Sequence, residues 1–131
     1  MENGSLTGRK ILIVEDDFSS RLYLNKILEK TGALLLNAVD GKEAVEVTRK
    51  NPDIDIILMD IQLPLMDGYT STCLIREFRK DIVIIAQTAY GLHGDKERLM
   101  NSGFNDYLIK PILSHTLLEK IGSFLTKTNS G

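Results

Sequence analysis

Four short apolar runs of this chain are followed by side chains that could do chemistry. The first run, "KILIV", leads into acids, the run "DIILM" leads into another acid, "IVIIA" is followed closely by a hydroxyl, and "DYLI" is followed by an ammonium and a proline. In sequence order the chemical groups are Glu15, Asp16, Asp17, Asp60, Thr88 and Lys110. If folding brings these groups together, they form a site with negative and positive charge side by side.

Such a cluster of acids predicts a bound cation and a reaction at a phosphoryl group. Two carboxylates about 5 Å apart repel by roughly 3 kcal/mol at an effective dielectric constant near 20, so the cluster must raise its pKa values or recruit a cation. Carboxylate oxygens suit Mg²⁺. Asp60 can act as a nucleophile that forms an acyl phosphate, while Lys110 and Thr88 stabilise charge on the phosphoryl oxygens.

Each of these residues also has an ordinary structural interpretation when it is taken alone. Acids after a strand are common N-terminal caps of helices, and we expect Asp17 to cap a helix that begins near Phe18. Thr88 is typical of a turn, and Lys110 before a proline is typical of a solvated loop. The predicted convergence of these groups at one place favours the functional interpretation.

The elements that must position these groups alternate between strands and helices. We predict strands over residues 10–14, 33–37, 55–59, 82–86 and 106–109 from their apolar runs, with segments of helical spacing between them. Gly32 is predicted to cap the end of the first helix, Asp40 and Glu43 form a candidate capping box, and the last helix is predicted to begin near Ser114.

Continuous apolar strands separated by helices predict a doubly wound α/β fold, in which helices cover both faces of a parallel sheet. In such a sheet the ligand site lies at the carboxyl ends of the strands. The acids, the hydroxyl and the ammonium all follow such ends, so the fold class itself predicts their convergence.

The composition is that of a single globular domain. The chain has 131 residues, of which 43% are hydrophobic and 26% are charged. A net charge of −2 argues against direct binding of nucleic acid, and no apolar run approaches the roughly 20 residues of a membrane span, so no membrane contact is expected. The single cysteine, Cys73, favours a reducing, cytoplasmic location. We expect residues 1–8 and 127–131 to be linkers around a domain at 9–126.

The motifs "ILIVEDD", "ILMDIQLPLMDG", "TAYG" and "DYLIKPI" stand in the order and near the spacings of a known family. Over residues 9–126 the chain resembles the receiver domain of bacterial two-component response regulators and hybrid histidine kinases, and a hybrid kinase is the parent that we expect. The resemblance implies a flavodoxin-like (βα)5 fold with five parallel strands in the order 2-1-3-4-5.

The resemblance also assigns roles at the acidic site. It implies that Asp60 is the phosphoacceptor and that Lys110 is the family's lysine. It implies that Asp16 binds Mg²⁺ directly together with Asp60, that Glu15 acts through water, and that the backbone carbonyl of Gln62 completes the protein ligands.

Further residues are assigned to switching and to access. Thr88 resembles the switch hydroxyl and Tyr107 the switch aromatic, while Gln62 and Tyr90 stand where the lifetime of the phosphate is set. Gln87 departs from the family, because an apolar residue often precedes the switch hydroxyl.

The resemblance implies a histidine kinase or a histidine phosphotransfer domain as partner, which supplies the phosphoryl group from a phosphohistidine. The receiver would catalyse its own phosphorylation and its own later hydrolysis. A phosphorylation-dependent homodimer through the fourth helix, fifth strand and fifth helix is a further expectation.

Alternative functions are kept open at this point. A phosphatase of the haloacid dehalogenase type also uses an aspartate at a strand end, but it needs a second aspartate two residues later, where this chain has Gln62. A flavin-binding module would need a phosphate-cradling loop where acids 15–17 stand. A protein-binding module that is not phosphorylated is the remaining alternative.

Overall fold

The computed structural model describes residues 5–89 and 95–125, in which five strands alternate with five helices. The strands are β1 (Lys10–Val14), β2 (Leu34–Ala38), β3 (Ile56–Asp60), β4 (Val83–Thr88) and β5 (Asp106–Ile109). The helices are α1 (Phe18–Glu29), α2 (Gly41–Lys50), α3 (Gly68–Phe78), α4 (Asp95–Asn101) and α5 (Ser114–Leu125).

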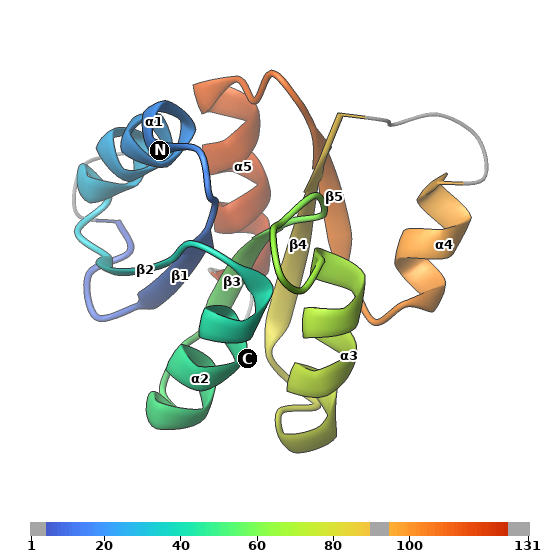
Figure 1. Cartoon of the computed structure of the whole chain (residues 1–131). Coiled ribbons are helices and arrows are strands. Elements are labelled where there is room, and N and C mark those ends of the chain that lie inside the picture. Colours follow the sequence, from blue (N-terminus) through green and yellow to red (C-terminus); the bar gives the residue numbers. More distant parts are fainter. Residues whose placement is uncertain (1–4, 90–94, 126–131) are drawn as a thin grey trace.

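All of these strands lie parallel in one sheet with the order β2-β1-β3-β4-β5 (Figure 1). The predicted fold class and the strand order implied by the resemblance are therefore confirmed. Because the chain order reverses direction between β1 and β3, the carboxyl ends of these two strands frame the crevice where α/β sheets bind ligands.

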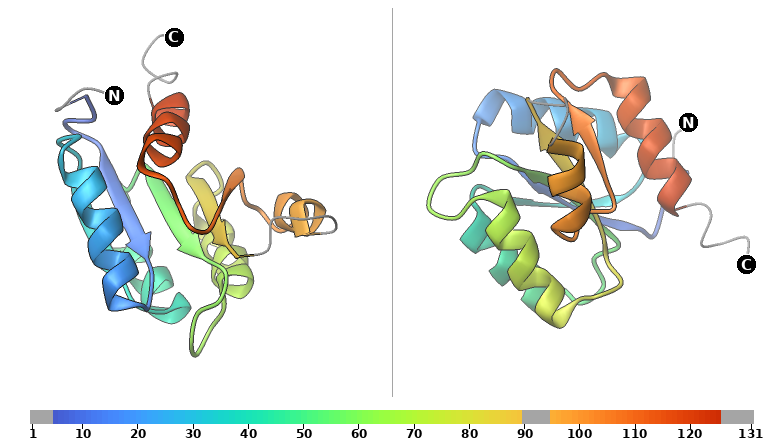
Figure 2. Two further views of the ribbon diagram at one scale, coloured as in Figure 1. Left: turned by 90° about the horizontal axis from the view of Figure 1, so that it is seen from above. Right: turned by 90° about the vertical axis from the view of Figure 1, so that its right-hand side faces the viewer.

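Helices cover both faces of the sheet. Helices α1 and α5 lie on one face, and α2 and α3 lie on the other, with α4 beside β5 (Figures 1 and 2). Successive residues of a strand point to opposite faces, so each strand contributes to two cores. On β1, for example, Ile11 and Ile13 pack in the α1/α5 core, whereas Leu12 and Val14 pack in the core under α2 and α3.

Three strands begin and end later than the sequence predicted. The strands predicted at 33–37, 55–59 and 82–86 are Leu34–Ala38, Ile56–Asp60 and Val83–Thr88 in the structure. The polar residues at the carboxyl ends join the ladder because their backbones pair with a neighbouring strand, Asp60 with Gln87 and Thr88 with Ile109. Asp60 is thus the last residue of β3 and not the first residue of a loop.

The predicted helix boundaries are largely confirmed. Asp17 and Asp40 cap α1 and α2, and their carboxylates accept hydrogen bonds from the backbone N–H of Ser20 (2.8 Å) and Glu43 (2.7 Å). The Glu43 side chain accepts a hydrogen bond from the N–H of Val39, one residue before the cap. Gly32 has a φ of 84°, a left-handed conformation that favours glycine after a helix.

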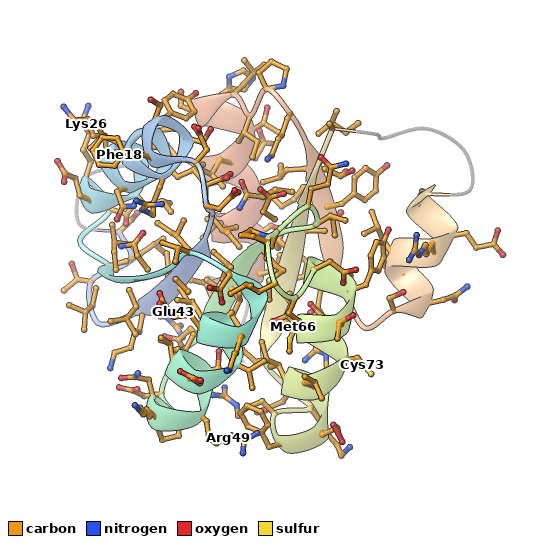
Figure 3. The ribbon with its side chains drawn as sticks, in the orientation of Figure 1. Phe18, Lys26, Glu43, Arg49, Met66 and Cys73 are labelled. Atoms are coloured by element: carbon orange, nitrogen blue, oxygen red, sulfur yellow. The ribbon has the colours of Figure 1, made fainter. Side chains whose placement is uncertain are left out.

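Two further features of the described residues concern the cysteine and the character of the helices. Cys73 is an exposed free thiol on the outer side of α3 (Figure 3). Among residues 5–89 and 95–125, no helix combines the length and the apolar character that crossing a membrane requires.

Candidate functional site

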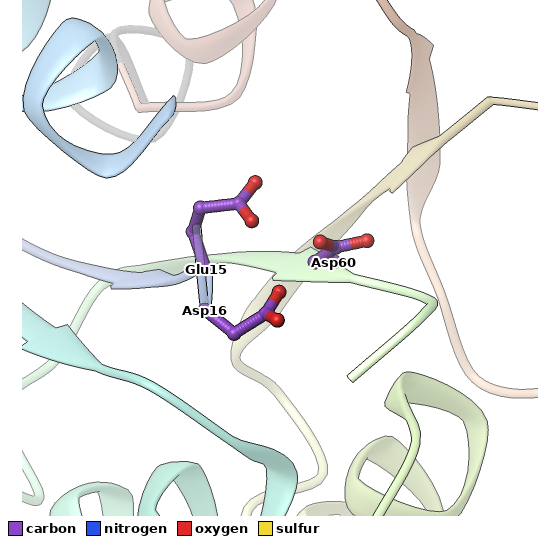
Figure 4. Close-up of side chains that lie close together, drawn as sticks. All are labelled: Glu15, Asp16 and Asp60. Carbon is purple, nitrogen blue, oxygen red and sulfur yellow. The ribbon is translucent and has the colours of Figure 1, made fainter. Parts of the chain in front are cut away.

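Three carboxylates meet where β1 and β3 end. Glu15 and Asp16 directly follow β1, Asp60 ends the adjacent β3, and an oxygen from each lies within 4.8 Å of the others (Figure 4). Glu15 and Asp60 are each only 2% exposed, whereas Asp16 is exposed. The expectation that the sheet brings these acids together is confirmed for all three, which we call the acidic cluster.

Lys110, which follows the edge strand β5, reaches the acidic cluster. The Lys110 ammonium Nζ lies 3.0 Å from Asp60 Oδ2 and 3.5 Å from Glu15 Oε1. Its backbone N–H donates to the carbonyl of Thr88 (2.8 Å), which fixes the residue just after β5. One positive charge therefore faces two buried negative charges.

Burial and charge shift the proton affinity of both partners of this contact. Burial, together with the charge of Asp60, raises the pKa of Glu15 to about 7, although its hydrogen bond from Asp17 and the charge of Lys110 act in the opposite direction. Burial alone would lower the pKa of Lys110, but the hydrogen bond to Asp60 and the negative charges of Asp60 and Glu15 outweigh it and leave the pKa raised. Lys110 is therefore a firmly held cation, and Glu15 titrates near neutral pH.

Backbone groups orient the carboxylates of the acidic cluster. The N–H of Asp17 donates to Glu15 Oε2, and the N–H of Gln62 donates to Asp60 Oδ1, each at 3.1 Å. The Arg21 guanidinium donates to the Glu15 carbonyl at 2.8 Å. These bonds leave Glu15 Oε1 facing the cluster with no hydrogen-bond partner.

The start of α3 presses against the strand that carries Asp60. The N–H of Gly68 donates to the carbonyl of Ile61 at 2.9 Å, and a Cβ added at Gly68 would collide with the backbone carbonyl of Asp60. Only glycine fits this close approach, so Gly68 sets the position of the loop that follows Asp60. No role was predicted for Gly68 from the sequence, although a glycine directly after Asp67, at the start of a helix, is a signal for such a close contact.

The donor set fits a hard divalent cation. All three ligand groups of the acidic cluster are carboxylates, and the buried Oε1 of one of them, Glu15, accepts no hydrogen bond and lies 3.5 Å from the Lys110 ammonium. Oxygen-only sites with few carboxylates and room for water are typical of Mg²⁺. The carboxylates of Glu15, Asp16 and Asp60 are therefore close enough together to hold such an ion.

Three of the remaining predicted residues lie on β4, on β5 and shortly after β3. Thr88 ends β4 next to Asp60's partner Gln87 and is 6% exposed. Tyr107 lies within β5, partly buried against the core under α2 and α3, and the Gln62 side chain is exposed. Tyr90 lies outside the described residues.

The structure adds Gln87 as a neighbour of the site. This residue is fully buried on β4 and lines a cavity together with Glu15 and Lys110. The strand predicted from the sequence ended at residue 86, so Gln87 stood only as a departure from the family pattern and not as a buried strand residue. A polar residue inside an apolar strand was the signal that could have identified it.

Comparison with known proteins shows the family to which the chain belongs. The family model of the response regulator receiver domain matches residues 11–122. The chain belongs to this family. The hybrid signal transduction histidine kinase I of Dictyostelium discoideum is 39% identical over 127 residues, which cover 91% of this chain and 7% of that protein. The sensor histidine kinase GacS of Pseudomonas protegens is 33% identical and is matched over 86% of this chain and 13% of its own length.

Solved structures of receiver domains agree with this assignment. The receiver domain of Ssk1 from Saccharomyces cerevisiae, crystallised with the phosphotransfer protein Ypd1, superposes with a TM-score of 0.86 at 32% identity, over 91% of this chain and 90% of that one. The receiver domain of the sensor histidine kinase PA1611 from Pseudomonas aeruginosa, solved with a magnesium ion in its active-site cleft, superposes with a TM-score of 0.81 at 35% identity, over 90% of this chain and 98% of that one.

The chain is therefore a receiver domain of two-component systems, and its acidic cluster lies at the carboxyl ends of β1 and β3, where the sequence predicted it. The chain spans only 7% of the hybrid signal transduction histidine kinase I and 6% of the hybrid signal transduction histidine kinase B of Dictyostelium discoideum.

Proposed function

We propose that this receiver domain accepts a phosphoryl group on Asp60 from a phosphohistidine. The observation that carries the proposal is the Lys110 ammonium, 3.0 Å from a buried Asp60 carboxylate inside the acidic cluster. Phosphoryl transfer requires a nucleophile, a cation beside it and a metal site lined by carboxylates. The reason is that the protein mainly positions the reacting groups and neutralises their charge.

In the proposed reaction an Asp60 carboxylate oxygen forms a bond to phosphorus. The bond from phosphorus to the imidazole nitrogen of the donor breaks, and the imidazole leaves with the electron pair and takes up a proton. Lys110, already poised against Asp60, neutralises charge on the phosphoryl oxygens, and the Thr88 hydroxyl donates a hydrogen bond to one of them. The same site later admits water for hydrolysis, with Gln62 and Tyr90 as the residues that control access.

Residues of the acidic cluster would hold Mg²⁺ during this reaction. Asp16 and Asp60 would bind it directly, Glu15 through water, and the backbone carbonyl of Gln62 would complete the protein ligands. When bound, Mg²⁺ supplies positive charge that offsets the charge of the phosphoryl oxygens. The closeness of the three carboxylates, whose oxygens lie within 4.8 Å of one another, supports this assignment.

An exposed apolar patch next to the site is suited to the phosphohistidine partner. The patch consists of Phe18 (68% exposed) and Leu22 (47%) on α1 together with Leu113 (55%) just before α5. The Tyr23 hydroxyl donates to the Ile112 carbonyl at 2.7 Å, so α1 and the β5–α5 loop lie side by side. Contiguous exposed apolar groups mark protein interaction sites, and the related Ssk1 receiver was crystallised with a phosphotransfer protein.

The signal is proposed to leave through α4, β5 and α5. Thr88 would move toward the phosphoryl group and Tyr107 would turn inward, which remodels this face and favours a homodimer through it. Support comes from the exposed apolar side chains of Met100 and Ile109 and from the partly buried position of Tyr107. The domain bounds 9–126, the cytoplasmic location and a hybrid histidine kinase as parent stay predictions.

Intact mass spectrometry tests the phosphoacceptor. The protein is incubated with Mg²⁺ and phosphoramidate, a small donor with a phosphorus–nitrogen bond, and is then weighed. We expect one phosphoryl adduct on the wild type and none on Asp60→Asn. Asp53→Asn serves as control and should be modified like the wild type, because Asp53 is an exposed acid that precedes β3 and pairs with Lys10 at the start of β1, at the opposite end of the strands from Asp60. An adduct that persists in Asp60→Asn would overturn the assignment.

A further inference from the structure

Gln87 is a buried polar side chain that the proposed phosphoryl transfer does not use. It is 0% exposed, and neither its amide nitrogen nor its amide oxygen has a hydrogen-bond partner. Buried polar atoms are nearly always hydrogen-bonded to protein or to water. A glutamine with both amide atoms unpaired therefore indicates that something polar belongs beside it.

The space beside Gln87 is a cavity of about 500 Å³ on the α1/α5 side of the sheet. Gln87 points to this side, because Ile85, two residues earlier on the same strand, packs in the α1/α5 core. The side chains of Tyr23 and Leu24 from α1 form one wall, and Ile112 from the β5–α5 loop forms the other. Gln87 lines the cavity although its own surface is 0% exposed.

Polar and apolar groups line the cavity together. Gln87 is accompanied by Glu15, whose Oε1 also lacks a hydrogen-bond partner, and by Lys110 and Ser20. The apolar part of the lining comes from Leu24, Pro111, Ile112 and Leu113, together with the ring of Tyr23, whose hydroxyl donates to the Ile112 carbonyl. A pocket of this size with a few convergent polar groups and apolar walls is typical of small-molecule sites.

We propose that this cavity binds a small uncharged molecule that has an amide-type edge and an apolar body. A primary carboxamide presents a donor and an acceptor side by side, and an amide, a lactam or a urea presents the complementary pair. The apolar remainder of the ligand would lie against Leu24 and Ile112.

Charge selects an uncharged ligand over an anionic one. Glu15 and Asp60 already share the single ammonium of Lys110 at 3.5 and 3.0 Å. With both acids ionised the local net charge is negative, so a ligand carboxylate next to Gln87 would be repelled. The proposal rests on the cavity and on Gln87, and it does not require that Asp60 be phosphorylated.

Benzamide is a suitable probe, because it combines a carboxamide with an apolar ring. It is titrated into the ¹⁵N-labelled protein without Mg²⁺ or phosphodonor, and the side-chain amide signal of Gln87 is followed by NMR. We expect saturable shifts of this signal and of the backbone signals of Leu24 and Ile112. Acetophenone, which has the shape of benzamide but no N–H, and benzoate, which adds a charge, should each bind at least about tenfold more weakly, as the loss of one buried hydrogen bond implies.

Protein variants complete the test. Gln87→Met keeps the volume and removes the amide, and it should weaken benzamide binding about tenfold or more. Asn101→Met, which removes an exposed amide on α4, should leave binding unchanged. The proposal is overturned if benzamide gives no saturable shift, which would mean that the cavity holds only water. It is equally overturned if benzamide and acetophenone bind alike to the wild type and to Gln87→Met, which would mean nonspecific apolar binding.

Discussion

Glu15 is the residue at which burial and metal binding compete most directly. Its carboxyl is 2% exposed, and burial together with the charge of Asp60 raises its pKa to about 7. The neutral form is therefore the more populated one below neutral pH, whereas a cation in the acidic cluster needs the ionised form. Proton and metal ion thus compete for the same side chain in the physiological pH range.

Lowering the pH below about 7 is expected to weaken Mg²⁺ binding, because protonation of Glu15 removes a negative charge from the acidic cluster that would hold the ion. If one proton is released, the dissociation constant should rise by up to about tenfold for each pH unit below 7. Calorimetric titration with Mg²⁺ at pH values from about 5 to about 9, roughly two units on either side of this pKa, measures the dependence. In Glu15→Gln the slope should be much flatter, and an unchanged slope in this variant would show that another group titrates.

Replacing Gln87 by methionine should stabilise the ligand-free protein. An unpaired buried polar group costs about 1–3 kcal/mol, and methionine fills a similar volume without polar atoms. The free energy of unfolding in urea should therefore rise in Gln87→Met. Gln62→Met removes an exposed amide and should change it by less than about 0.5 kcal/mol. Equal stability of Gln87→Met and the wild type would mean that the amide is already satisfied by bound water.

The junction between β3 and α3 is the element on which the geometry of Asp60 depends most. Asp67 caps α3 by accepting a hydrogen bond from the N–H of Thr70 at 2.8 Å, and Gly68 lets the first turn of the helix touch the backbone of Asp60. The position of the phosphoacceptor is therefore set by a helix start as well as by the strand.

Gly68→Ala is expected to damage both the fold and the site, because the added Cβ would collide with the backbone carbonyl of Asp60. We expect a loss of about 1–3 kcal/mol in the free energy of unfolding, as for overpacked sites. The rate of phosphorylation by phosphoramidate should also fall. Thermal unfolding and intact mass measure the two effects. Cys73→Ala, on the exposed face of the same helix, is the matched control; a Gly68→Ala protein that matches it in both measurements would contradict the close contact.

At the element scale the sequence predicted every strand and the parallel sheet, because apolar runs and helical spacing are local patterns. The exact ends were wrong by one or two residues at β2, β3 and β4. Whether Asp60 and Thr88 belong to strands is decided by backbone pairing with Gln87 and Ile109, which are distant in sequence. The acidic cluster followed from the rule that parallel strands end at one edge. The cavity beside Gln87 could not be predicted, because it depends on how α1 and the β5–α5 loop pack.

At the scale of the whole molecule, the acidic cluster and the apolar patch lie at the same end of the molecule, near the carboxyl ends of the strands. Residues from β1, β3 and the segment after β5 form the charged site, and the patch of Phe18, Leu22 and Leu113 flanks it on α1 and before α5. A partner that docks on the patch would bring its phosphohistidine to Asp60. Small donors need no such docking surface.

Phe18→Glu is therefore expected to separate the two kinds of donor. Transfer from a phosphorylated histidine phosphotransfer protein should slow by about tenfold or more, as for an interface anchor worth over 1.4 kcal/mol. Transfer from phosphoramidate should stay at the wild-type rate. Both rates are measured by following phosphorylated protein over time. Leu34→Glu changes an equally exposed leucine on the edge strand β2 and should affect neither donor. A loss with both donors would place Phe18 in the reaction itself.

The two ends of the folded chain are tied together at one corner of the molecule. The Arg9 guanidinium donates to the carbonyl of Leu125 at 3.0 Å, so the residue before β1 and the last residue of α5 are neighbours. A short bridge could therefore close the backbone into a ring, and new termini could be cut in a surface turn without disturbing the sheet. Because the two ends of the domain lie side by side, the domain can be inserted into a single loop of another protein without stretching that loop.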